Sequence, residues 1–228
     1  MDHADDGGDN NDVFVYMGGD QFVPRNVRYV RVHKSVKIIR ARAFHPCRNL
    51  VSIELHDGVE IIEELAFYLC HSLRGIKLAG VRVIGTNAFY ECTTLAEVEF
   101  GDKLETIGDG AFAATSLRII KLPKVVSIGD TAFAACEQLT EVQLSDDLER
   151  IRDWAFNGCP RLRRIVTPLK DNLLGKDVFH SCLDLSQVDL LVGGIHKTIS
   201  SLLLDSWRNE MNDEIDRIIR DLPNTPHY

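Results

Sequence analysis

The 228-residue sequence predicts an α/β repeat solenoid, a right-handed coil with one parallel sheet on one side and short helical turns opposite. The first observation is an Ala-Phe pair that recurs six times, followed by a degenerate Val-Phe copy. The phenylalanines of these seven copies are 21 to 23 residues apart, at Phe44, Phe67, Phe89, Phe112, Phe133, Phe156 and Phe179. The second observation is a Cys three residues after the Phe in six copies, which accounts for every cysteine: Cys47, Cys70, Cys92, Cys136, Cys159 and Cys182. A fixed period of this length is typical of stacked coils.

The N-terminal residues are predicted to form a tail and a cap. Residues 1–12 are acidic and contain almost no apolar side chain, so they are predicted to be a disordered tail. Residues 13–26 begin with the β-prone run Val-Phe-Val-Tyr-Met, which ends at a Gly-Gly-Asp turn signal. We expect a strand followed by a turn here, because the open end of a solenoid has to be covered.

Residues 27–190 are predicted to form seven repeats of 21 to 23 residues. In the copy that begins at Leu73, apolar residues follow at Ile76 and Leu78, an alternation typical of a short strand with one buried face. A turn is expected next, where glycine follows isoleucine at Ile84-Gly85 and would ease a positive φ angle. The following Ala-Phe-x-x-Cys segment is expected to form one short helical turn.

Residues 191–228 are predicted to be a C-terminal helical cap. Their apolar residues fall at helical spacing, at Ile199, Leu202, Leu203, Trp207, Met211, Ile215, Ile218, Ile219 and Leu222. Pro223 would end the helix. The alternative is an amphipathic helix that recruits another chain.

The repeat unit resembles the BspA-like class of leucine-rich repeats. The resemblance rests on the pattern Ile-Gly-x-x-Ala-Phe-x-x-Cys-x-x-Leu-x-x-Val, as at residues 84–98, and covers residues 27–190. The Asn ladder of the commonest leucine-rich repeats is absent from the sequence. The resemblance implies a leucine-rich-repeat solenoid that binds other proteins. Many members are cell-surface proteins, so cell-surface adhesion is one alternative that the resemblance implies.

Composition and motifs argue against several classes of function. No apolar run approaches the roughly 20 residues of a membrane span, so no membrane partner is expected. The acidic first residues do not form an export signal, so a cytoplasmic protein with reduced cysteines is expected. There is no phosphate-binding glycine loop, nucleophile elbow or His-Glu-x-x-His motif. We therefore expect a non-enzymatic protein without cofactor or metal.

The cysteines and histidines carry the weaker hypotheses of metal or redox chemistry. A cysteine column inside the coil would place thiols about 5 Å apart with parallel Cβ vectors, which does not suit a disulfide. The sequence contains no Cys-x-x-Cys pair, so buried structural thiols are favoured over a zinc site. His33 and His56 share one slot in adjacent repeats, and two solvated histidines are favoured over a metal pair.

The outward positions of the predicted strands are the candidate binding face for an unidentified protein partner. They are Tyr29, Arg31, Glu54, Lys77, Glu99, Lys121 and Gln143. The charges alternate in sign along this column, so neighbouring strands would bring opposite charges about 5 Å apart. The alternation is equally consistent with a self-neutralising ladder that favours correct stacking. A monomer is favoured.

A basic first turn is the second candidate site. Residues 21–50 hold eight basic and no acidic residues, although the net charge of the chain is −8. The candidate anion-binding residues are Arg25, Arg28, Arg31 and Lys34. They would suit a nucleic acid or another anionic ligand, but the overall acidity disfavours general nucleic-acid binding. The alternative is a charged edge that blocks end-to-end stacking.

Overall fold

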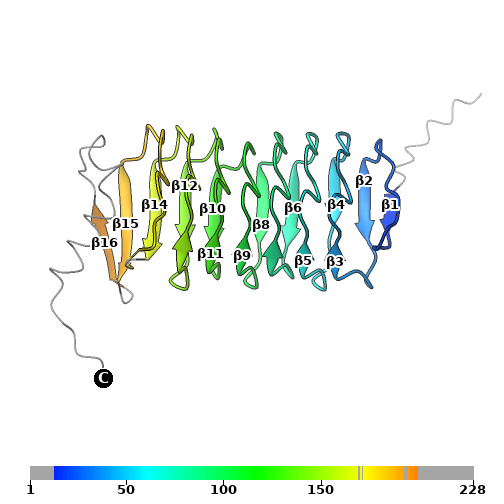
Figure 1. The fold of residues 1–228 in the computed structure, drawn as a ribbon, viewed down its shortest axis with the longest axis horizontal. Helices are drawn as coiled ribbons and strands as arrows, with labels where there is room; N and C mark the ends of the chain where they lie inside the picture. Colours follow the sequence, from blue (N-terminus) through cyan, green and yellow to red (C-terminus); the bar gives the residue numbers. More distant parts are fainter. Residues whose placement is uncertain (1–12, 169, 171, 193–194, 200–228) are drawn as a thin grey trace, which may run out of the picture.

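Sixteen β-strands stack along one axis in the part of the chain that the computed structural model describes, residues 13–168, 170, 172–192 and 195–199 (Figure 1). Ten strands have three to six residues: β1 (Val13–Tyr16), β2 (Tyr29–Val32), β4 (Ser52–Glu54), β6 (Gly75–Leu78), β8 (Glu97–Phe100), β10 (Ile119–Leu122), β12 (Glu141–Leu144), β14 (Arg164–Pro168), β15 (Gln187–Val192) and β16 (Ile195–Ile199). Six have two residues: β3 (Ile38–Ile39), β5 (Ile61–Ile62), β7 (Val83–Ile84), β9 (Thr106–Ile107), β11 (Ser127–Ile128) and β13 (Arg150–Ile151).

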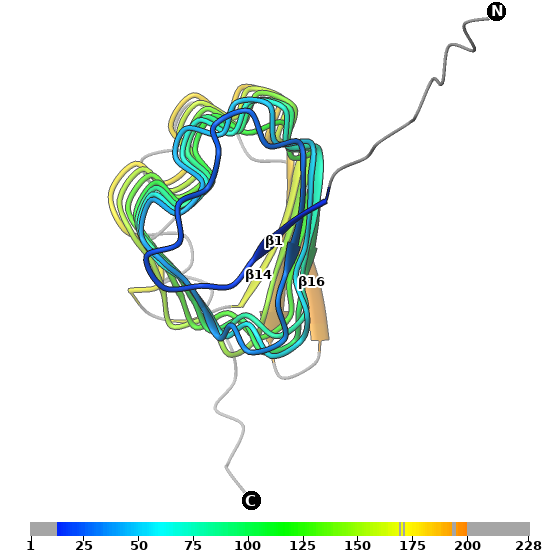
Figure 2. The same cartoon turned by 90° about the vertical axis from the view of Figure 1, so that its right-hand side faces the viewer.

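The long strands cover one side of the solenoid. They form two five-stranded sheets, β1-β2-β4-β6-β8 and β10-β12-β14-β15-β16, which follow each other along the axis. Viewed along that axis, the coils superimpose as a ring whose long strands lie along one side (Figure 2). The predicted strands, such as the one that contains Ile76 and Leu78, are therefore present. Their parallel pairing makes the expected solenoid.

A third sheet, made of the two-residue strands, contradicts the prediction of one parallel sheet. The six two-residue strands pair in the order β13-β11-β9-β7-β5-β3, all in parallel. Each contains the isoleucine that the sequence assigned to a turn, such as Ile84, which is fully buried. Once coils stack at strand spacing, any extended dipeptide meets its equivalent one coil away, and the backbone groups of the two then pair.

The expected helical turns are absent from the described residues. In the third copy the amides of Asn87, Phe89 and Glu91 donate to carbonyls of the next coil, at 2.8, 2.8 and 3.0 Å. Asn87 and Glu91 both adopt left-handed φ angles of 53°. An α-helix needs each amide to bond back along its own chain. Because every second amide donates to the next coil, it cannot form the bond within its own chain that a helix needs, and a turn forms instead.

Left-handed residues occur at two fixed points of the repeat. Seven precede the Phe by two residues: Arg42, Leu65, Asn87, Gly110, Thr131, Trp154 and Asp177. Six follow it by two: Leu69, Glu91, Ala114, Ala135, Gly158 and Ser181. The prediction of positive φ after the isoleucine is wrong, since Gly85 has no positive φ. Gly85 is needed for another reason, because a Cβ atom there would lie 2.7 Å from the backbone nitrogen of Glu64.

Glycine at a left-handed alanine should stabilise the protein. Ala135 is exposed and has φ of 56°, which costs an L-residue about 1–2 kcal/mol. Glycine removes that cost, but it loses more backbone entropy on folding, which costs about 0.5–1 kcal/mol. We expect Ala135→Gly to raise the free energy of unfolding in urea by about 0.5–1 kcal/mol. The neighbouring Ala134 has no positive φ, so Ala134→Gly should lower it; a loss in both variants would contradict the turn geometry.

The phenylalanines form one continuous column inside the coil. From Phe44 to Phe179 each ring stacks on the next, with centroids 4.9–5.7 Å apart and planes within 11° of parallel. All are buried. At the N-terminal end the ring of Tyr16, on β1, lies 5.1 Å from Phe44 and covers the column. β1 pairs in parallel with β2, from Val13 opposite Tyr29 onward.

The C-terminal end of the described chain is a strand. β16 pairs antiparallel with β15, which corrects the prediction of a helical cap for residues 195–199. The pairing covers the edge that β15 would otherwise expose. Ile199, the first residue of the predicted helical pattern, ends β16. The remainder of that pattern, residues 200–228, lies outside the described residues, as does the tail of residues 1–12.

Candidate functional site

The outward residues of the long strands form the sheet face, which we define as the exposed side of β2, β4, β6, β8, β10 and β12. Parallel register places Arg31 opposite Glu54 and Lys77 opposite Glu99. It also places Lys121 opposite Gln143, and all of these side chains are exposed. Tyr29 begins β2 and is half-buried. The candidate partner residues therefore lie on one surface.

The charges on the sheet face form separate pairs. The Nε atom of Arg31 lies 2.8 Å from Oε2 of Glu54, and Nζ of Lys77 lies 2.9 Å from Oε2 of Glu99. Hydrogen bonding to Glu99 raises the pKa of Lys77, and the carboxylate charge adds to this. Within the described residues no ion pair links Glu54 to Lys77 or Glu99 to Lys121. The expected continuous ladder is therefore interrupted after every second strand.

Reversing the charge of Lys77 tests the register. Lys77→Glu replaces the ion pair by two carboxylates on adjacent strands, which repel each other. We expect a lower melting temperature at low salt, and most of the loss should disappear in 1 M salt, where screening extends only about 3 Å. A loss that is independent of salt would mean that the side chain of Lys77 is not on the exposed face.

A groove of about 740 Å³ opens on the sheet face where these interruptions fall. Its lining comes from β4, β6, β8 and β10: Ile53, Glu54, Leu55, Gly75, Ile76, Lys77, Ala96, Glu97, Val98, Glu99, Arg118 and Ile119. Gly75 has no side chain to fill the space between its neighbours on β4 and β8. Ile119 is 52% exposed and adds apolar surface to the groove. The groove thus combines apolar contact surface with both signs of charge.

Weak strand pairing explains where the groove lies. β4 and β6 are joined by one residue pair, Ser52 opposite Gly75, and no residue pair joins β8 to β10 among the described residues. The short fourth copy lies next to this break, since Leu117 follows Phe112 after five residues and not six. The missing residue shifts the chain just before β10. Sequence analysis did not identify Gly75, Glu97 or Ile119 as residues of a site.

The cysteines bond to the backbone of the neighbouring coil. Five thiols donate to the carbonyl of the Phe one coil earlier at 3.1–3.3 Å, from Cys70, Cys92, Cys136, Cys159 and Cys182. In the fourth copy Thr115 replaces the cysteine, and its hydroxyl donates to the carbonyl of Phe112 at 2.9 Å. Burial raises the pKa of Cys92 to about 12. These thiols are free, buried and hydrogen-bonded, which suits a structural role.

Thiol labelling tests this role. All six cysteines are free and buried, so we expect an aromatic disulfide reagent to label them much faster after denaturation than before. Because the pKa of Cys92 is about 12 in the folded state against an ordinary 9.0, burial of the neutral thiol stabilises the fold fully below pH 9. That contribution should be lost as the pH rises from 9 towards 12. Rapid labelling of all six in native buffer would contradict a buried column.

The repeat pattern matches an established family description. The model of the BspA type leucine rich repeat region (6 copies) matches residues 16–127 and 120–204. The chain belongs to the BspA-type leucine-rich repeat family. This membership agrees with the parallel solenoid described above, and it confirms the resemblance in the sequence. No curated protein matches the chain.

Solved structures of bacterial repeat proteins resemble this BspA-type solenoid. A leucine-rich repeat protein of T. pallidum has 29% identity and a TM-score of 0.50, over 68% of this chain and 64% of that protein. The match therefore spans less than two thirds of the T. pallidum protein. A leucine-rich repeat protein from Eubacterium ventriosum has 16% identity and a TM-score of 0.49, over 72% of this chain and 73% of that one.

The basic first turn of the BspA-type solenoid does not form a single cluster. Arg25 and Arg28 precede β2 and Lys34 follows it, so a strand of about 13 Å separates the two groups. Arg31, between them, is in the ion pair with Glu54. The four candidate anion-binding residues therefore do not lie together in one cluster. Arg28 instead lines a hollow that it shares with Arg74.

The two histidines of adjacent coils bond to local groups. The Nε2 atom of His56 lies 3.1 Å from the carbonyl oxygen of His33, and Nδ1 of His33 lies 2.8 Å from the hydroxyl of Ser35. The described residues contain no group of three or more His, Cys, Asp or Glu side chains that could hold a metal ion. The same residues contain no helix that is long and apolar enough to cross a membrane.

Proposed function

We propose that this BspA-type protein is a non-enzymatic module that binds another protein in the groove of its sheet face. The observation that carries the proposal is the groove itself, whose lining includes the exposed Ile119 together with the apolar residues Ile76 and Val98. Exposed apolar surface with a charged rim is typical of protein-binding sites. The rim carries carboxylates and cations together, which suits a partner of mixed charge.

The broken strand pairing offers a way to hold a peptide. β8 and β10 are not paired with each other, and both line the groove, which could receive an extended segment of a partner at this break. A volume of about 740 Å³ accommodates several residues of such a segment. Its apolar side chains would contact Ile119, and its basic side chains would face Glu97.

The composition of the groove supports binding in preference to catalysis. Its lining includes no Ser, Thr, Cys or His, and its ionisable side chains, such as Glu54 and Lys77, are exposed and paired with opposite charges, which does not suit a general base or nucleophile. We further propose a cytoplasmic monomer. The six free cysteines suit a reducing compartment.

Affinity capture with paired variants tests the proposal. Ile119→Lys places a charge in the groove, and Leu183→Lys makes the same change at another exposed apolar residue, 61% exposed and outside the groove. Partners captured from an extract of the source cells by the unmodified protein should be lost with Ile119→Lys and kept with Leu183→Lys. Equal recovery with both variants, measured by quantitative mass spectrometry, would rule out the groove as the binding site.

A further inference from the structure

A second hollow lies just before the first residues of β2, β4 and β6, beside the sheet face. Its volume is about 480 Å³, and its lining is Arg28, Asn49, Val51, Ser72, Arg74 and Thr94. Five of these six residues are polar, and none is acidic. The hollow therefore has a lining charge of +2, although the chain as a whole has a net charge of −8.

The two arginines of the hollow lack the acidic partners that other arginines have. A recurrent pattern on this solenoid pairs an arginine with a glutamate 23 residues later, one coil on, as in Arg40 with Glu63 and Arg82 with Glu105. The residue 23 positions after Arg28 is Val51, which cannot neutralise it, and the residue 23 positions after Arg74 is Glu97, which lines the neighbouring groove and forms no ion pair with Arg74. Within the described part of the chain, neither Arg28 nor Arg74 forms an ion pair. Their guanidinium groups remain available to an anion from outside.

Neutral hydrogen-bond donors complete the hollow. The side chains of Asn49 and Ser72 form no hydrogen bond with other described residues, so both can donate to a ligand. Thr94 donates its hydroxyl to the carbonyl groups of His71 and Leu73, at 2.7 and 2.9 Å, and so shapes the wall. The guanidinium of Arg28 lies over the ring of Tyr29, 5.5 Å from its centroid, which restricts its position.

We propose that this hollow binds a phosphate or sulfate monoester group, a function separate from protein binding in the groove. Arg28 and Arg74 are two coils apart, about 10 Å, and line the same space, so both can converge on one ligand. A tetrahedral oxyanion has enough oxygens to accept from two guanidinium forks and from neutral donors together. A carboxylate has only two oxygens and would leave some of these donors without an acceptor.

Titration with inorganic phosphate and inorganic sulfate tests the site. The probe is the Nε–H signal of each arginine in ¹H–¹⁵N NMR spectra, recorded at constant ionic strength. We expect saturable shifts at Arg28 and Arg74 and none at Arg163, which occupies the same place in a later repeat but is paired with Asp184. Shifts that do not saturate with either anion, or equal shifts at Arg163, would overturn the proposal.

Variants and larger probes extend the test. R28Q and R74Q should each weaken binding by roughly tenfold or more, because each removes charge-assisted hydrogen bonds, whereas R163Q should leave it unchanged. Equal weakening by R163Q would mean general charge attraction and would overturn the site. If a variant proves less stable, the shifts of the unmodified protein still decide. Glucose 6-phosphate and glucosamine 6-sulfate distinguish the two sources, since the natural class should saturate at lower concentration.

Discussion

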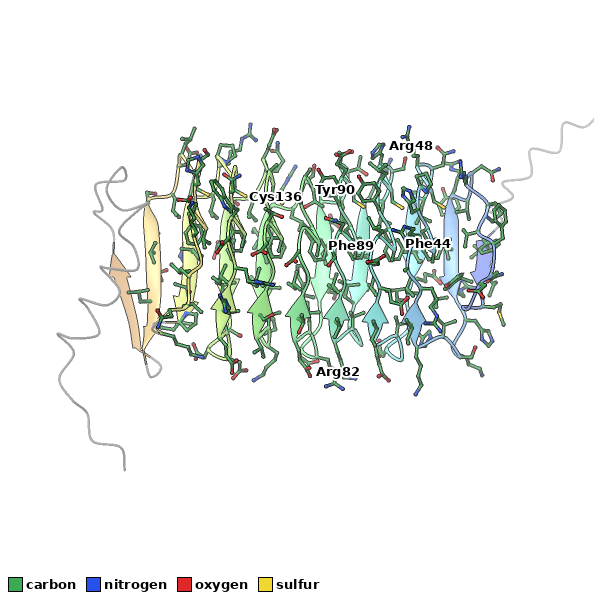
Figure 3. The ribbon with its side chains drawn as sticks, in the orientation of Figure 1. Phe44, Arg48, Arg82, Phe89, Tyr90 and Cys136 are labelled. Carbon is green, nitrogen blue, oxygen red and sulfur yellow. The ribbon has the colours of Figure 1, made fainter. Side chains whose placement is uncertain are left out.

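Replacement of Phe89 by alanine should lower the free energy of unfolding by about 3–5 kcal/mol. The ring lies in the middle of the phenylalanine column, stacked at 4.9 Å on Phe67 and at 4.9 Å on Phe112. It is completely buried inside the solenoid, and Arg48 and Arg82 project from opposite edges of the solenoid (Figure 3). Its loss leaves a cavity that stacked coils cannot close, because hydrogen bonds between coils fix their spacing.

The same substitution at Phe179 is the matched control. Among the described residues Phe179 stacks on Phe156 alone, at 5.7 Å, and it retains slight exposure. We expect a smaller loss there, since part of the column on one side is missing. Urea unfolding of both variants provides the comparison. Equal losses would contradict a stack in which central coils depend on two neighbours.

The sequence predicted the buried columns well because burial in a solenoid repeats with the chain. Leu73, Ile76 and Phe89 were assigned to the interior from spacing alone, and each is buried. The cysteine column was also recognised, but its reason was not. Only the structure shows that each thiol donates to a carbonyl one coil earlier, as Cys92 does to Phe67.

The turns could not be predicted because their pattern fits two backbones. Ala-Phe-x-x-Cys puts apolar residues one helical turn apart, and the same spacing serves a turn with left-handed residues. Glycine usually marks such residues, but Leu65 and Thr131 occupy these points and gave no signal. The two-residue strands were not predicted for a similar reason. Each contributes one buried isoleucine per coil, and a single apolar residue shows no alternation that would indicate a strand.

The site was predictable only in part. Register follows from the repeat, so the exposed charges of Arg31 and Lys77 were placed on one face correctly. The groove arises from differences between repeats: the missing side chain at Gly75, and the lost pairing between β8 and β10. The hollow is lined by Arg28 and Arg74, which are two coils apart. Along the chain, Arg28 belongs to the basic segment of residues 21–50 and Arg74 does not, so charge counting did not connect them.

The turn after β6 gives the second large effect, because Gly80→Ala should destabilise the protein by about 1–3 kcal/mol. This turn has only two residues between Leu78 and Val81, and Gly80 is buried there against the previous coil. A Cβ atom would lie 2.6 Å from the carbonyl carbon of Asp57 and 2.9 Å from the carbonyl oxygen of Val59. Both are backbone atoms, so the added methyl group can fit only if the two coils move apart.

Gly58→Ala provides the control for Gly80→Ala, since it makes the same change in the turn one coil earlier. A Cβ atom on Gly58 would meet only the ring of His56, at 2.9 Å, and this side chain can shift away more easily than backbone can, at the cost of its hydrogen bonds to the carbonyl of His33 and the amide of Gly58. We expect a loss below about 1 kcal/mol, or a slight gain because alanine restricts the unfolded chain. Urea unfolding of the two variants measures the difference. If Gly80→Ala lowers the free energy of unfolding no more than Gly58→Ala does, the close approach of these two coils does not exist in solution. The spacing between coils would then not be the reason for a glycine at position 80.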